Sequence, residues 1–175
     1  MNLSKKFFFI ILFFFLSINS LKAEDKVSYI DIDFILSNTI AGKKLLNIFK
    51  IEEESKINKF KLKDENFQNE EKKILAKKNL ISKEEINNEL KILNNKFQKY
   101  SKEKVKEIDE FKISRNKNIV NFLNLINPII ENYMKDNSIY MLIDKKNVFI
   151  ASKNYDITNN LIELIDKQIK DIEIK

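Results

Sequence analysis

The sequence predicts a mostly helical α+β protein, in which a small β-rich body carries a long antiparallel coiled-coil helical hairpin as an arm. Three observations support this prediction. The 175 residues include one glycine and one proline, whereas a typical chain has about 7% and 5%, so few breaks are expected. A sparse apolar stripe at helical spacing occupies the middle of the chain. Beyond residue 23, dense β-forming segments occur only near the two ends.

The first 23 residues have the pattern of a cleaved secretory signal peptide. Lys5 and Lys6 precede an apolar run over residues 7–18, and Ala23 offers a small residue at the cleavage point. The run is short for a membrane span, which needs about 20 apolar residues. An uncleaved membrane anchor is the alternative. We therefore expect residues 24–175 to act outside the cytoplasm as a single domain, with a body at 24–44 and 128–175 and an arm at 45–127.

Composition excludes several classes of function. The chain has no cysteine and no histidine, so disulfides, His metal sites and Ser-His or Cys-His catalysis are ruled out. One glycine cannot build a phosphate-binding loop. Loss of the signal lowers the formal net charge from +6 to +3, and Arg115 is the only arginine. We expect no enzyme activity, catalytic residue, metal, cofactor or nucleic-acid partner.

The body is predicted to contain three short strands, at residues 27–32, 139–144 and 148–151, with a turn at 145–147 that makes the last two a hairpin. A final helix follows, with Thr158 as its cap beside Asp156, and Ile157 buried. Three short strands are marginal in a monomer, so the sheet should be completed by oligomerisation. The residues expected to build this oligomer body are Val27, Tyr29, Ile30, Ile32, Ile139, Met141, Ile143, Val148 and Ile150.

The arm is predicted from a seam of apolar residues. The first helix runs from about residue 41 to 78, with seam residues at spacings of 3 and 7. Ser82 and Glu85 form a capping-box pattern that starts a second helix, whose seam repeats at spacings of 4 and 3. Pro128 either kinks this helix or separates two helices. The seam residues are Ile57, Phe60, Phe67, Ile74 and Ile81, then Ile86, Leu90, Leu93, Phe97 and Tyr100.

Four short motifs in this order resemble the Skp (OmpH-like) family of periplasmic outer-membrane-protein chaperones. They are Tyr29-Ile30-Asp31, Ala41-Gly42-Lys43, Leu142-Ile143-Asp144 and Asp156-Ile157-Thr158. The resemblance implies a homotrimer whose helical arms hang from a β-rich body and enclose a cavity. It also implies an ATP-independent holdase in the periplasm that binds unfolded outer-membrane proteins and prevents their aggregation in transit.

Within the arm, the resemblance suggests two groups of client-contacting residues. The four phenylalanines could instead pack the two arm helices against each other. The three lysines could instead form a solvated face, and they could also contact anionic lipid at the membrane surface. The other class of function we consider is a structural or adaptor coiled-coil protein of the cell envelope, which binds one folded partner. The candidate client-contacting residues are Phe60, Phe67, Phe97, Phe111, Lys63, Lys73 and Lys77.

Overall fold

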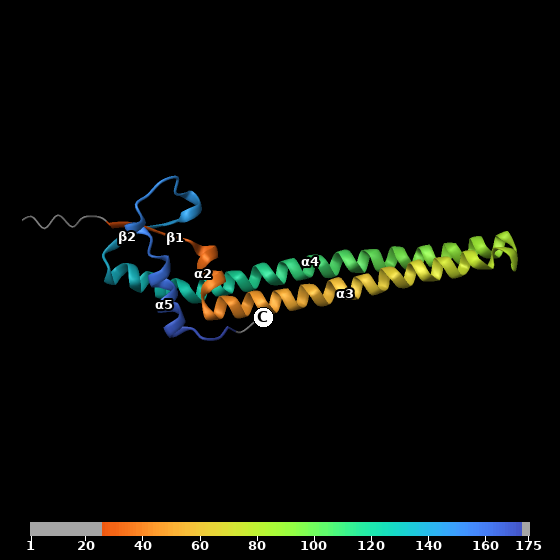
Figure 1. Cartoon of the computed structure of the whole chain (residues 1–175), viewed down its shortest axis with the longest axis horizontal. Coiled ribbons are helices and arrows are strands. Elements are labelled where there is room, and N and C mark those ends of the chain that lie inside the picture. Colours follow the sequence, from red (N-terminus) through yellow and green to blue (C-terminus); the bar gives the residue numbers. More distant parts are fainter. Residues whose placement is uncertain (1–25, 173–175) are drawn as a thin grey trace, which may run out of the picture.

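The computed structural model describes residues 26–172 and shows an elongated molecule with a body at one end and a helical arm at the other (Figure 1). The arm consists of α3 (Ile40–Ala76) and α4 (Lys83–Asp136). The body contains β1 (Lys26–Ile30), α2 (Ile32–Asn38), β2 (Ile139–Asp144) and α5 (Thr158–Gln168), together with the C-terminal part of α4. The mostly helical prediction is therefore confirmed. The predicted signal peptide lies outside the described residues.

The sheet has two strands among residues 26–172, and they run parallel. Val27 pairs with Met141 and Tyr29 with Ile143, so strands from the two ends of the chain meet as predicted. The predicted third strand at 148–151 is wrong. The side chain of Asp144 accepts a hydrogen bond from the Lys146 N–H, and the chain turns out of the sheet through a 3₁₀ turn at Lys145–Asn147.

The Asp156-Ile157-Thr158 motif ties the final helix to the end of β1. The Thr158 Oγ1 accepts a hydrogen bond from the Asp31 N–H at 3.0 Å, and Asp156 makes an isolated parallel bridge to Tyr29. Thr158 is the first residue of α5, and Ile157 occupies the cap position, so the prediction of Thr158 as the cap is wrong. The Asp156 carboxylate accepts the Thr158 N–H at 3.0 Å. Ile157 is buried, as predicted.

The arm leaves the body at a tight corner between α2 and α3. Thr39 caps α3 by accepting the Gly42 N–H, and the Asp166 carboxylate on α5 accepts the Ile40 N–H at 2.7 Å. A Cβ added to Gly42 would lie 2.0 Å from the Leu36 carbonyl oxygen. Gly42 is therefore needed for the close approach of the two helices.

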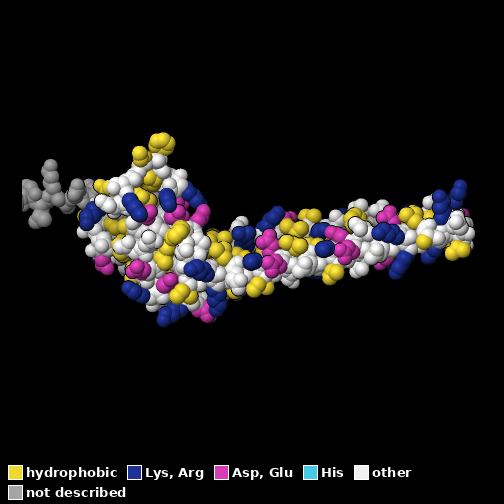
Figure 2. All heavy atoms as spheres, viewed as in Figure 1, with side chains coloured by type: hydrophobic (Ala, Val, Ile, Leu, Met, Phe, Trp, Pro, Cys, Tyr) yellow, Lys and Arg dark blue, Asp and Glu magenta, His cyan; other side chains and the backbone are white. Residues whose placement is uncertain are grey.

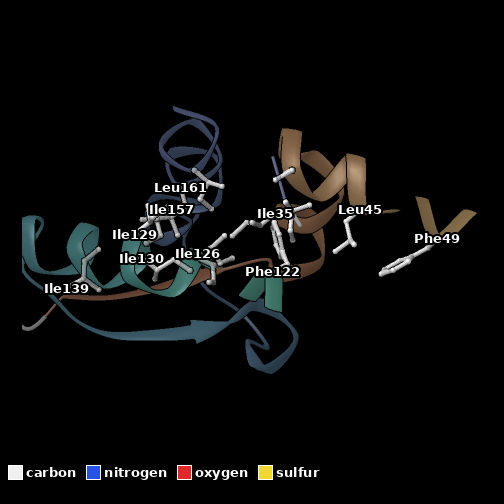
Figure 3. Packing of buried hydrophobic residues seen from close by; sticks show 14 residues of the cluster. Ile35, Leu45, Phe49, Phe122, Ile126, Ile129, Ile130, Ile139, Ile157 and Leu161 are labelled. Carbon is white, nitrogen blue, oxygen red and sulfur yellow. The ribbon is translucent and has the colours of Figure 1, made fainter. Parts of the chain in front are cut away.

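A single apolar core fills the body and the root of the arm (Figure 3). Ile35, Leu45, Phe122, Leu161 and Ile165 are fully buried. They come from α2, α3, α4 and α5, so each of the four α-helices within residues 26–172 contributes to the core. This shared core fixes the direction in which the arm projects.

The long helix α4 begins at the predicted capping box and passes through Pro128 without ending. The Ser82 and Glu85 side chains each bond the other residue's backbone N–H, which confirms the capping box. Pro128 lies inside the 54-residue helix. Pro128 and Asn124, whose carbonyl would have accepted the missing N–H, are both exposed. Water can satisfy that carbonyl, so the proline does not break the helix.

Candidate functional site

Three ion pairs across the seam set the register of the two arm helices. Lys59 and Glu107 lie 2.6 Å apart, Asp64 and Lys104 2.7 Å, and Lys77 and Glu89 2.9 Å. Later residues of α3 pair with earlier residues of α4, so the helices run in opposite directions. Each pair is partly exposed and contributes little stability alone. Together they hold the register along a seam with few buried side chains.

An aromatic cluster fills the seam in the middle of the arm. The Phe67 ring on α3 lies edge-on to Phe97 with centroids 5.5 Å apart, and it stacks on Tyr100 at 5.3 Å. The Tyr100 hydroxyl donates a hydrogen bond to the Phe60 carbonyl at 3.2 Å. This cluster is the main apolar contact between the helices far from the body.

A charged pair accompanies the aromatic cluster. A hydrogen bond from Lys104 lowers the pKa of Asp64, and the same bond raises the pKa of Lys104. Burial raises the pKa of the neighbouring Tyr100 hydroxyl. The Lys104 ammonium also lies 5.4 Å from the centre of the Phe60 ring. Around Lys104, where the apolar repeat is interrupted, the seam is therefore held by charge.

The structure separates the four phenylalanines predicted to contact clients. Phe60 is buried between the helices, and Phe111 packs against the body core. Phe67 is half-buried, and Phe97 is 41% exposed. Phe67 and Phe97 lie together and line one face of the arm, so they remain available to a ligand.

The three candidate lysines have different environments. The Lys63 ammonium lies 5.2 Å from the centre of the Tyr100 ring, and Lys77 is paired with Glu89. Lys73 is exposed and forms no ion pair within residues 26–172. Lys73 belongs to the free end of the arm, where residues 72–83 contain five lysines and no acidic residue. Leu80, which lies in this segment, is 82% exposed. Figure 2 shows Lys side chains around apolar ones at this end.

Sequence reasoning missed a set of exposed apolar residues on the outer faces of the arm. Ile57, Leu62, Val105 and Ile113 are all between 57% and 67% exposed. Leu62, Val105 and Ile113 do not fit the heptad seam, and this misfit was the available signal. Ile57 was predicted to lie in the seam, and its exposure shows that this prediction is wrong. Figure 2 shows apolar side chains scattered between charged ones along the arm. The arm therefore presents a surface of mixed apolar and charged character.

The residues predicted to build an oligomer body fall into three groups. Ile30 and Ile139 belong to the core of the chain itself. Tyr29, Ile32, Ile143 and Val148 are half-buried, whereas Val27, Met141 and Ile150 are exposed. Two neighbours that were not predicted, Tyr140 and Phe149, are also exposed. The body thus carries an uncovered apolar surface beside a two-stranded sheet.

No helix within residues 26–172 combines the length and apolar character that crossing a membrane requires. Over the same residues, acidic side chains do not gather in a group that could hold a metal ion.

Comparisons with known proteins identify the family. The sequence model of the family described as "Outer membrane protein (OmpH-like)" matches residues 26–165. A search of curated proteins finds no match. A crystal structure of an OmpH-like protein from Caulobacter crescentus CB15, described as a candidate outer membrane chaperone, superimposes with a TM-score of 0.74. It is 18% identical, and the alignment covers 84% of this chain and 87% of that one. The chain described here thus belongs to the OmpH-like family.

Proposed function

We propose that this protein is an ATP-independent holdase of the periplasm, which binds unfolded outer-membrane proteins and keeps them from aggregating. The observation that carries the proposal is the mixed surface of the arm. Exposed apolar residues such as Leu62 and Ile113 stand among lysines and glutamates on a helical pair that no third layer of the described chain covers. Many weak contacts of this kind suit a client without fixed structure. Membership of the OmpH-like family supports the same function.

The test is an aggregation assay with the purified chain from residue 24 onward. A urea-unfolded β-barrel outer-membrane protein is diluted into buffer with increasing amounts of the chain, and light scattering is followed. We expect scattering to fall to near baseline once the chain is in excess over the client. Unchanged scattering across the range would contradict the holdase. Tight binding to one folded envelope protein, with no effect on unfolded clients, would favour an adaptor.

We further propose that three copies assemble through the body. A two-stranded sheet is marginal by itself. Within the described chain the outer edge of β2 has no strand partner, and the outer edge of β1 has only the bridge from Tyr29 to Asp156. Met141, Phe149 and Ile150 extend an apolar surface next to that sheet. A second and third copy would cover this surface and supply the missing strand partners.

Phe149→Ser tests the assembly without disturbing the core, because the Phe149 side chain is fully exposed. We expect the wild-type chain to have the mass of a trimer by light scattering at micromolar concentration and the variant to dissociate. Leu80→Ser, which removes a similarly exposed residue at the other end of the molecule, should leave the mass unchanged. A monomeric wild type, or a variant that stays trimeric, would contradict the proposal.

A peripheral contact with anionic lipid is the third part of the proposal. The five lysines of residues 72–83 are complementary in charge to a negative membrane surface, and exposed Leu80 could insert among its lipids. Co-sedimentation with phosphatidylglycerol vesicles should be lost when Lys72, Lys73, Lys77 and Lys78 are changed to glutamine. Equal sedimentation of wild type and variant would contradict a contact through the tip.

A further inference from the structure

The distal arm contains an open groove between its two helices, beside the aromatic cluster. The groove encloses about 850 Å³, with an apolar floor formed by Phe67, Leu90, Leu93 and Phe97. Its rim is polar, and the rim residues are Asp64, Gln68, Glu71, Asn87, Lys91, Asn94 and Lys104. A groove with an apolar floor and a polar rim is the usual form of a binding site.

The sequence of α3 explains why the seam is open at this place. Residues at seam spacing on α3 alternate between apolar and acidic from Phe60 to Ile74, with carboxylates at Asp64 and Glu71. Asp64 is satisfied by Lys104, but Glu71 is exposed and forms no ion pair within residues 26–172. An apolar residue at 71 would extend the seam over Leu90 and narrow the groove. With the acidic residue there, Leu93 is buried but Phe67, Leu90 and Phe97 stay partly exposed on the floor.

Three carboxamide side chains on the rim suit a polypeptide ligand. Gln68, Asn87 and Asn94 are exposed and make no hydrogen bond to other described residues. Each carboxamide can both donate and accept, so it can bond the N–H and C=O groups of an extended backbone whatever its sequence. The rim also carries both acidic and basic side chains, so it does not select for client segments of one sign of charge.

The dimensions of the groove match a short extended segment. The lining residues on α4 run from Asn87 to Lys104, which is about 25 Å along the helix. An extended chain of about eight residues covers the same length. Alternate side chains of such a segment point to the same side. An apolar side chain at every second position would therefore meet the apolar floor, while polar ones would face water.

From these observations, we infer that the groove binds an extended client segment in which apolar and polar residues alternate. The inference rests on the proposed holdase function and names the feature of the client that the arm recognises. Strands of outer-membrane barrels have this alternation over about ten residues. The groove would therefore hold one future strand of the client at a time, through side chains that the folded barrel turns towards lipid.

Two Asn-Asn pairs on α4 provide matched controls. Asn87 and Asn94 line the groove, whereas their exposed neighbours Asn88 and Asn95 do not, because successive helix residues point about 100° apart. A photo-crosslinking amino acid placed at 87 or 94 should label a urea-unfolded β-barrel protein during dilution. The same group at 88 or 95 should label it at least about fivefold less. Equal labelling at all four positions would overturn the inference.

A binding assay tests the alternation itself. The probe is a fluorescent ten-residue peptide with alternating phenylalanine and serine or threonine, compared with a peptide of the same composition whose phenylalanines are contiguous. The alternating peptide should bind more tightly, and Asn94→Trp, which fills the groove, should weaken it at least about fivefold, as loss of a main contact does. Asn95→Trp should have no effect. Equal binding of both peptides, or displacement of the alternating peptide by lysophosphatidylcholine at lower concentration than by unlabelled peptide, would overturn the assignment.

The two proposals fail in different ways. If the wild-type chain does not suppress aggregation of the unfolded barrel protein, the holdase function is wrong. If it suppresses aggregation and Asn94→Trp does so equally well, without preference in the crosslinking, the holdase function stands and the groove is not its client site.

Discussion

The body and the distal arm are held together by different forces. In the body, Ile35, Phe122 and Leu161 are completely buried, and each contributes a large hydrophobic term. Beyond the root of the arm, the buried apolar residues of the described chain are Phe60, Ile86, Leu93 and Tyr100, each slightly exposed. Three ion pairs between the helices supplement this thin seam. A holdase benefits from this division, because a stable body can carry an arm that adapts to its client.

Truncating a core residue should have the largest effect on this comparison. Phe122→Ala removes a fully buried ring from the core that all four helices share, and it should lower the free energy of unfolding by about 3–5 kcal/mol. The matched variant Phe60→Ala removes the same ring from the arm seam. Its effect on global unfolding should be clearly smaller, because the arm can open locally.

Urea unfolding followed by circular dichroism, at one fixed protein concentration, measures both variants. Phe49→Ala provides a control at the root of the arm, where the ring packs into the core, and it should resemble Phe122→Ala. Equal losses for Phe60→Ala and Phe122→Ala would show that the arm and body unfold as one unit.

Gly42→Ala should have the next largest effect, because it disturbs the tight corner between α2 and α3, where the arm leaves the body. The new Cβ would lie 2.0 Å from the Leu36 carbonyl oxygen and 2.7 Å from the Thr39 Oγ1. The helices must move apart, which should cost about 1–3 kcal/mol. Ala substitution normally stabilises a helix relative to glycine, so a variant as stable as wild type in thermal unfolding would refute the close approach.

Hydrogen exchange compares the regions without mutation. Amides of the distal arm, from about residue 57 to 108, should exchange at least about tenfold faster than those of β2, a difference of about 1.4 kcal/mol in opening free energy. The reason is the scarcity of buried side chains along the seam. Exchange measured by mass spectrometry on peptic fragments resolves the two regions. Equal protection would mean that the hairpin is as stable as the core.

Local patterns in the sequence predicted those parts of the fold that local forces determine. The capping box at Ser82 and the seam of α4 follow from residue spacing alone. The strand predicted at 148–151 failed because its β-forming residues have no neighbouring strand in the described chain, and strand formation depends on such neighbours. The groove was not predicted either, since a heptad pattern does not show which seam position is left uncovered. The Glu71 carboxylate at a seam position was the sign that the sequence offered.

The pH dependence of the arm should be the smallest effect. The Asp64 pKa is lowered below 3.8 by Lys104, so the stabilisation from this pair is complete above about pH 4 and disappears as pH falls through the lowered pKa. The Lys104 pKa is raised above 10.5, so the same stabilisation is complete below about pH 10.5 and is lost as pH rises through the raised pKa. Both side chains are about a third exposed, which limits the pair to ~0.2–1 kcal/mol.

Asp64→Asn should therefore speed exchange in arm peptides slightly at pH 6 and make no difference near pH 2. Glu110→Gln, which breaks a largely exposed pair with Lys106, should change neither. If Asp64→Asn had no effect on arm exchange at pH 6, the aromatic cluster alone would hold this part of the seam.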